Sequence, residues 1–182
     1  MTRTIINQLP RRKNYFKGRY TIPIGYPWLT YGAIMQLELI LNSDFKVLEL
    51  GSGGSTIFFS RRAKSVLSLD MNKDWSDAVK KALPQPTNVR LLYGTKEELT
   101  EVIKGQPDLY YDLVLLDIGG HDKIRYGMGE EVKRKIKMGG FLVVDNYDTK
   151  YMNRLNYTGF DVYTYDDIEW SGRGTRICIR RF

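Results

Sequence analysis

The sequence predicts an α/β fold built on a mostly parallel sheet, and three observations lead to this prediction. Short apolar runs alternate with segments of helical periodicity through most of the 182 residues. A glycine-rich turn, residues 51–54, separates the first apolar run from the helix pattern that follows it. The continuous run Leu113–Leu116 suits a central strand that is buried on both faces. We therefore expect seven strands with helices on both faces of the sheet.

The first half of the chain carries three of these strands. Pro27 is well placed as the first residue of a helix that continues to about Asn42. The strands are expected at 46–50, 66–70 and 89–93, and a helix at about 55–63 follows the first of them. Asp74 is expected to cap the helix after the second strand, and Thr95 with Glu98 forms a capping box after the third.

The second half supplies the other four strands, at 112–117, 141–145, 160–165 and 175–181. A helix is expected from about Asp122 to the glycine pair at 139–140, with the basic residues of 133–137 on its solvated side. A further helix is expected at about 149–157.

Composition excludes several classes of protein. No apolar run approaches the roughly 20 residues that a membrane-spanning helix needs, so we expect no membrane association. The one cysteine, Cys178, rules out an internal disulfide framework, and a reducing, cytoplasmic setting is the default. The net charge of +7 permits an anionic partner, but the basic residues fall into three small clusters rather than one groove.

The glycine turn is the clearest functional signal. A strand, a glycine turn and a helix together bring a ligand against backbone N–H groups at the start of the helix. The dinucleotide fingerprint G-x-G-x-x-G is not present, because Thr56 stands where its third glycine would be. Asp70 closes the second strand 21 residues after Glu49, a spacing that suits a ribose diol. A purely structural turn in another α/β protein is the alternative.

At these residues the sequence resembles the class I S-adenosylmethionine (SAM)-dependent methyltransferases. V-L-E-L-G-S-G-G-S-T (47–56) matches the first motif of that family, and V-L-S-L-D (66–70) matches its second-strand acidic motif. The resemblance implies a Rossmann-like, seven-stranded sheet that is completed by a C-terminal antiparallel hairpin, and SAM as the cofactor. It also implies these cofactor-binding residues: Glu49, Gly51, Ser52, Gly53, Ser55, Thr56, Asp70, Met71, Thr95 and Asp117.

We expect a single domain in three parts, of which the resemblance covers only about residues 45–182. Residues 1–30 form an N-terminal arm, 31–44 form a helix that covers the ligand, and 45–182 form the SAM-binding core. The arm interleaves basic residues with Tyr15, Phe16 and Tyr20, a pattern that could contact nucleic acid. We favour the alternative, in which the arm packs these aromatics on the domain and exposes its charges.

Oxygen-bearing side chains end the fourth and fifth strands. Asp117, Asp145 and Asn146 are ligands of the kind that Mg²⁺ or Ca²⁺ takes. Their positions resemble those in the catechol and caffeoyl-CoA type O-methyltransferases, which implies a divalent metal that holds a diol. Related methyltransferases without a metal carry the same residues, where they shape the turn or bind the substrate.

The proton acceptor departs from the pattern of that subgroup. The catechol type has a lysine three residues after the strand-end aspartate, and Gly120 stands at that position. His121 and Lys123 are the nearby substitutes, and a histidine suits general-base chemistry near neutral pH. We therefore assign the catalytic roles to Asp117, His121 and Lys123.

The function expected from the sequence is SAM-dependent methyl transfer to an oxygen of a small hydroxylated acceptor. A nucleic acid, most plainly RNA, is the alternative acceptor because of the positive charge and the basic arm. A non-catalytic SAM-binding subunit that needs a partner is a third reading. A nicotinamide-dependent oxidoreductase ranks lower because of Thr56. The oligomeric state is left open.

Overall fold

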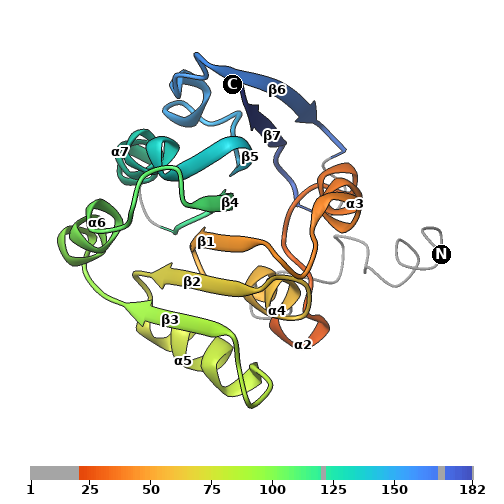
Figure 1. The fold of residues 1–182 in the computed structure, drawn as a ribbon, viewed down its shortest axis with the longest axis vertical. Helices are drawn as coiled ribbons and strands as arrows, with labels where there is room; N and C mark the ends of the chain where they lie inside the picture. The colour runs from red at the N-terminus through yellow and green to blue at the C-terminus, as the bar shows by residue number, and fades with distance from the viewer. Residues whose placement is uncertain (1–20, 120–121, 168–170, 182) are drawn as a thin grey trace.

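A computed structural model describes residues 21–119, 122–167 and 171–181. Within these residues the chain forms one seven-stranded sheet of order β3-β2-β1-β4-β5-β7-β6, with helices on both of its faces (Figure 1). Strands β1 to β5 run parallel, and β7 lies antiparallel between β5 and β6. The parallel sheet and its antiparallel C-terminal hairpin confirm the predicted α/β architecture.

The elements follow one another as alternating strands and helices. The strands are β1 (Lys46–Leu50), β2 (Ser65–Asp70), β3 (Val89–Tyr93), β4 (Tyr111–Leu116), β5 (Ile136–Asp145), β6 (Phe160–Tyr165) and β7 (Thr175–Arg180). The helices are α2 (Thr21–Ile24), α3 (Tyr31–Ile40), α4 (Gly54–Ser60), α5 (Lys73–Ala82), α6 (Lys96–Lys104) and α7 (Asp122–Val132). Two 3-10 turns, η3 (Lys133–Lys135) and η4 (Met152–Arg154), complete the set among the described residues.

Alternate residues of the central strands fill a core on each face of the sheet. Leu48, Leu50 and Val114 pack with α6 and α7 on one face. Val47 and Leu113 pack with α3 and α4 on the other face. Burial on both faces explains why these strands read as continuous apolar runs. The sheet therefore holds the carboxyl ends of β1, β2, β4 and β5 rigidly at one edge.

Two helix starts differ from the prediction. The helix that was expected from Pro27 begins at Tyr31 after Thr30, and Pro23 lies in the short helix α2. The helix α5 is capped by Asn72, whose side chain accepts a hydrogen bond from the backbone N–H of Trp75, and not by Asp74. Asp and Asn are equally good N-cap residues, so the sequence could not show which of the two caps α5, and the loop geometry decides it.

The segment after α7 also corrects the prediction. The helix ends at Val132, and Ile136 already belongs to β5, so the glycine pair at 139–140 lies inside the strand. Lys135 is buried rather than solvated, because its ammonium donates to the backbone carbonyls of Lys104 and Gln106 and to Asp108. The helix expected at 149–157 is only the turn η4.

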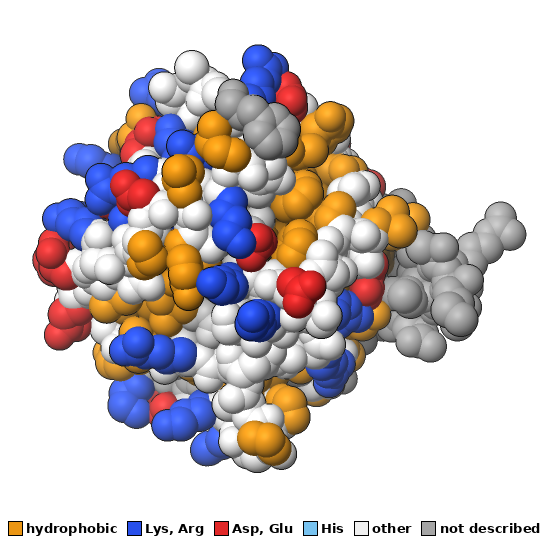
Figure 2. Space-filling view, in the orientation of Figure 1, with side chains coloured by type: hydrophobic (Ala, Val, Ile, Leu, Met, Phe, Trp, Pro, Cys, Tyr) orange, Lys and Arg blue, Asp and Glu red, His pale blue; other side chains and the backbone are white. Residues whose placement is uncertain are grey.

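The surface charges are mixed on the face that Figure 2 shows, where Asp and Glu side chains lie among the Lys and Arg side chains. The four basic residues of 133–137 each have an acidic partner: Lys133 pairs with Glu130, Arg134 with Glu131, Lys135 with Asp108, and Lys137 with Asp112. No helix within the described residues has the length and apolar character needed to cross a membrane.

Candidate functional site

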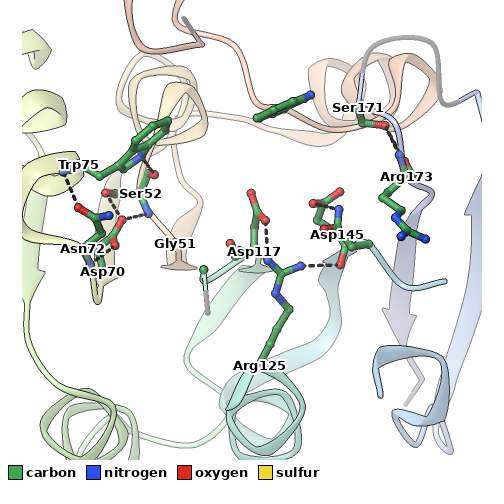
Figure 3. A pocket seen from close by; sticks show the side chains of 13 residues that line it. Gly51, Ser52, Asp70, Asn72, Trp75, Asp117, Arg125, Asp145, Ser171 and Arg173 are labelled. Atoms are coloured by element: carbon green, nitrogen blue, oxygen red, sulfur yellow. Dashed lines mark hydrogen bonds and ion pairs between the residues drawn. The ribbon is translucent and has the colours of Figure 1, made fainter. Parts of the chain in front are cut away.

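A cavity of about 410 Å³ opens at the carboxyl ends of the parallel strands (Figure 3). The loops after β1, β2, β4 and β5 supply most of its lining, and the segment before β7 closes one side. This is the position at which open α/β sheets bind their ligands. The lining residues are Trp28, Gly51, Ser52, Asp70, Asn72, Trp75, Asp117, Gly119, Arg125, Asp145, Asn146, Ser171 and Arg173.

Gly51 begins the turn after β1 and has no tolerance for a side chain. Its φ angle is +95°, a conformation that residues with a Cβ rarely adopt. A Cβ there would also lie 2.5 Å from the backbone carbonyl oxygen of Asp117. The turn of β1 and the end of β4 are thus pressed together at the floor of the cavity.

Asp70 ends β2 and faces this turn with both carboxylate oxygens engaged. Oδ2 accepts hydrogen bonds from the backbone N–H of Ser52 at 2.8 Å and from its hydroxyl at 2.5 Å. Oδ1 accepts one from the backbone N–H of Asn72 at 2.8 Å. Asp70 therefore fixes the turn, and a ligand hydroxyl must share Oδ1 or displace the hydroxyl of Ser52.

Glu49 is completely buried behind the turn and does not line the cavity. Its Oε2 accepts hydrogen bonds from the hydroxyls of Thr56 at 2.6 Å and Ser68 at 2.5 Å. Thr56 in turn accepts one from the backbone N–H of Gly53. Burial raises the pKa of Glu49 to about 7, against the lowering effect of these hydroxyl donors. Glu49 and Thr56 brace the turn from behind.

Trp75 covers the turn from the side of α5. Its indole N–H donates to the backbone carbonyl of Ser52, and its ring lies next to Gly53. The indole is thereby held against the cavity at the Asp70 end (Figure 3). One wall of the cavity is therefore aromatic, and its floor consists of backbone.

Two carboxyl groups and one guanidinium occupy the opposite end of the cavity. Arg125, from the first turn of α7, reaches between Asp117 and Asp145 (Figure 3). Its Nη2 lies 3.2 Å from Asp117 Oδ1. Burial raises the pKa of Asp117, while the charge of Arg125 lowers it. Burial and then the repulsion from Asp117 hold the pKa of Asp145 well above its usual range.

Asn146 makes the turn after β5. Its φ angle is +54°, in the left-handed region that asparagine tolerates better than most residues. Its side-chain amide donates to Asp145 Oδ2, while Asp145 Oδ1 is buried without a hydrogen-bond partner among the described residues. The turn-shaping role that the sequence left open for Asn146 is therefore visible in the backbone.

The cavity brings together some of the residues that the sequence singled out. Gly51, Ser52, Asp70, Asp117, Asp145 and Asn146 line it. Other predicted cofactor contacts do not line the cavity, namely the buried residues Glu49, Gly53, Ser55 and Thr56 and the partly buried Met71. Thr95 is outside the lining too and caps α6. Lys123 is exposed on α7 and is not in the lining either. His121 lies outside the described residues, as does the arm at 1–20.

Sequence reasoning missed Asn72, Trp75, Arg125, Ser171 and Arg173. Arg125 offered a signal, because a basic residue in the first turn of the helix after β4 faces the end of that strand. Trp75 offered a similar signal, because it lies in the first turn of the helix after β2 and can face the end of that strand. Ser171 and Arg173 follow β6 in a segment without a motif, so only the tertiary fold brings them to the cavity.

No protein-family model matches the chain, and no curated protein matches it. Several solved structures, however, have a similar fold. The O-methyltransferase from Bacillus cereus, in complex with S-adenosylhomocysteine (SAH), has a TM-score of 0.64 at 12% identity over 99% of this chain and 89% of that one. An rRNA methylase from Streptococcus thermophilus has a TM-score of 0.60 at 16% identity, over 84% and 95%. A precorrin-8W decarboxylase from Methanobacterium thermoautotrophicum has a TM-score of 0.61 at 20% identity, over 83% and 88%.

The chain thus has the fold of the class I SAM-dependent methyltransferases, as its motifs indicated. At these identities the likeness concerns the fold, and the names of these three proteins describe different activities.

Proposed function

We propose that the protein transfers a methyl group from SAM to an acceptor that enters the cavity beside Asp117 and Asp145. One observation carries the proposal. A single cavity holds the glycine turn with Asp70 at one end and a cluster of ionisable side chains at the other. The first end suits a nucleoside with an amino-acid tail, and the second suits a polar acceptor.

SAM would lie along the ends of β1 and β2. Gly51 and Gly53 would border its methionine part, with Ser52 beside them, and Asp70 would hold the ribose hydroxyls. Ser55, Thr56 and Glu49 would act indirectly, by keeping the turn in shape. Met71 and Thr95 would lie toward the adenine. The aromatic wall of Trp75 would then exclude water from the sulfonium, which strengthens the electrostatic interactions around it.

The acceptor would lie between the methyl group and the β4–β5 end. Transfer is a direct displacement, in which the acceptor oxygen forms a bond to the methyl carbon and the sulfur keeps the electron pair of the broken bond. The protein contributes alignment and a route for the proton of the acceptor. Asp117, which lines the cavity, would take this proton. His121, which lies outside the described residues, and Lys123 are the further candidates from the sequence.

A small hydroxylated acceptor fits the size and polarity of this end. Trp28, which is 40% exposed, offers an aromatic surface at the rim, and Arg173 offers a charge. RNA is the second candidate, favoured by the net charge of +7 and by the basic residues of the arm. The choice between these two acceptors does not bear on where the protein works. A reducing, cytoplasmic setting stays an expectation from the single cysteine.

Mg²⁺ does not fit the side chains as they stand. Arg125 already pairs with Asp117, and the amide of Asn146 points its N–H at Asp145 rather than its oxygen at a metal. No group of three acidic, histidine or cysteine side chains placed to hold a metal occurs within the described residues. No step of the proposed reaction therefore passes through a metal.

The test is transfer of a labelled methyl group from SAM. The purified protein is incubated with labelled SAM and, separately, with a fraction of small metabolites and with total RNA from the same cell extract. Label in the small-molecule fraction supports the leading proposal, and label in RNA that falls steeply with salt supports the second. Binding of SAM without transfer to either fraction would favour the non-catalytic subunit.

A further inference from the structure

The guanidinium of Arg125 is fixed in place by four separate acceptors. Its Nε donates to the backbone carbonyl of Ile118 at 2.9 Å, and its Nη1 donates to that of Asp145 at 3.1 Å. Its Nη2 donates to both the carbonyl and the carboxylate of Asp117, each at 3.2 Å. The side chain is only 11% exposed. Arg125 is therefore built into the site and is not a surface arginine resting across it.

The charge of Arg125 stands where the strand-end carboxylates would otherwise need a cation. Asp117 and Asp145 end adjacent parallel strands and line the same cavity. Two neighbouring carboxylates that are largely shielded from water repel one another unless a positive charge lies close to them. An arginine supplies that charge permanently, since it stays protonated at every physiological pH.

One acceptor is left over in this arrangement. Asp145 Oδ1 is buried and has no hydrogen-bond partner among the described residues, while Asp145 itself is 4% exposed and lines the cavity. A buried acceptor without a donor destabilises the folded state until a donor arrives. The remaining requirement of the site is thus one hydrogen-bond donor, whereas a metal ion would need several free oxygens.

We propose that Arg125 takes the place of a divalent metal, so that this end of the cavity binds the uncharged O–H group of an acceptor through Asp145 Oδ1. The inference rests on the proposed function and narrows it. The acceptor needs a single hydroxyl at the reacting end and no second oxygen for chelation.

Manganese is the probe, because free Mn²⁺ gives a paramagnetic resonance signal that disappears on binding. Wild-type protein is titrated with Mn²⁺ beside Arg125→Gln, which removes the positive charge beside Asp145 and frees the carboxylate of Asp117. We expect no Mn²⁺ binding at the cavity in the wild type. The variant should bind Mn²⁺ with a dissociation constant at least about tenfold below the lower limit that the titration sets for the wild type. Adding Asp145→Asn to the variant should abolish the gain.

Arg173→Gln is the matched control. It removes an arginine from the rim of the same cavity, where the side chain is 55% exposed and pairs with Asp148, without touching Asp117 or Asp145. We expect its Mn²⁺ binding to equal that of the wild type. Arg125→Met, which keeps the apolar stem, serves if Arg125→Gln does not fold.

Two results would overturn the proposal. One is a Mn²⁺ site in the wild type that Asp145→Asn removes, because the arginine would then not exclude a metal. The other is a folded Arg125 variant that gains no Mn²⁺ affinity, because the arginine would then not hold the place of a cation. The titration needs neither SAM nor an acceptor, so it is independent of whether the protein binds SAH.

Discussion

The hydroxyl of Ser52 lies 2.5 Å from Asp70 Oδ2, one of the two carboxylate oxygens open to a ribose hydroxyl under the proposed function. If SAM binds as proposed, the side chain of Ser52 competes with the cofactor, while its backbone N–H keeps Asp70 in position. We expect Ser52→Ala to bind SAH as tightly as the wild type or more tightly, by roughly twofold to tenfold. Calorimetric titration measures the affinity.

Ser60→Ala is the control for this change, because Ser60 lies at the far end of α4 and donates only to the carbonyl of Ile57. Its SAH affinity should match that of the wild type. A clear loss of affinity in Ser52→Ala alone would mean that the hydroxyl supports the bound state instead of competing with it.

Glu49 gives the protein a pH dependence of known sign. Its pKa is about 7 in the folded state against 4.5 as a reference, so the folded state holds an extra proton between these values. Stability therefore falls as pH rises through this range, by roughly 3 kcal/mol in total. Glu49→Gln should remove this loss. Urea unfolding at pH 5 and pH 8 measures the free energy of unfolding of both proteins. The difference between Glu49→Gln and the wild type should shift in favour of the variant at pH 8, and an equal difference at both pH values would contradict the assignment.

At the scale of the element, the capping box of α6 separates a structural role from a ligand role. The hydroxyl of Thr95 accepts the backbone N–H of Glu98 at 3.3 Å, and Glu98 Oε2 accepts that of Thr95 at 2.7 Å. We expect Thr95→Ala to lower the free energy of unfolding by about 1 kcal/mol and to leave SAH affinity unchanged.

Thr100→Ala is the matched change, since the hydroxyl of Thr100 donates to the carbonyl of Lys96 in the interior of the same helix. Its cost in stability should be smaller than that of Thr95→Ala. If Thr95→Ala weakens SAH binding several-fold, Thr95 contacts the adenine, as the resemblance implied.

Elements with a strong local signal were predicted well. The strand of Lys46–Leu50 and the capping box at Thr95 depend on side chains within a few residues, and both appear where they were expected. The end of α7 was not predicted, because the apolar residue Ile136 fits a helix face and a buried strand equally well. Lys135 was assigned to solvent because its partners, the Lys104–Asp108 segment, lie far away in the sequence.

At the scale of the whole molecule, the order of the sheet determines how much of the site could be predicted. Gly51, Asp70 and Asp117 follow strand ends, and parallel strands bring such residues to one edge, so the sequence alone placed them together. Arg125 joins them only because α7 packs back against β4, and Arg173 joins them only through the hairpin. Side chains that arrive through packing leave no pattern of spacing.

The net charge is also a property of the whole molecule. The basic residues of 133–137 are paired with acidic side chains of α7, of β4 and of the loop before β4, so each charge of this run has a partner. We therefore test the RNA alternative at the arm, where the sequence interleaves basic and aromatic residues. Removing residues 1–20 should abolish RNA binding if the arm provides it, and should leave SAH affinity unchanged.

The central claim is that the cavity binds SAM through Asp70 and the glycine turn. Calorimetric titration with SAH tests it most directly, with wild type and Asp70→Ala side by side and far-ultraviolet circular dichroism to verify the fold. The account predicts micromolar binding to the wild type and a loss of at least about tenfold in the variant, because the ribose loses charge-assisted hydrogen bonds. Folded wild-type protein that binds neither SAH nor SAM would contradict the account.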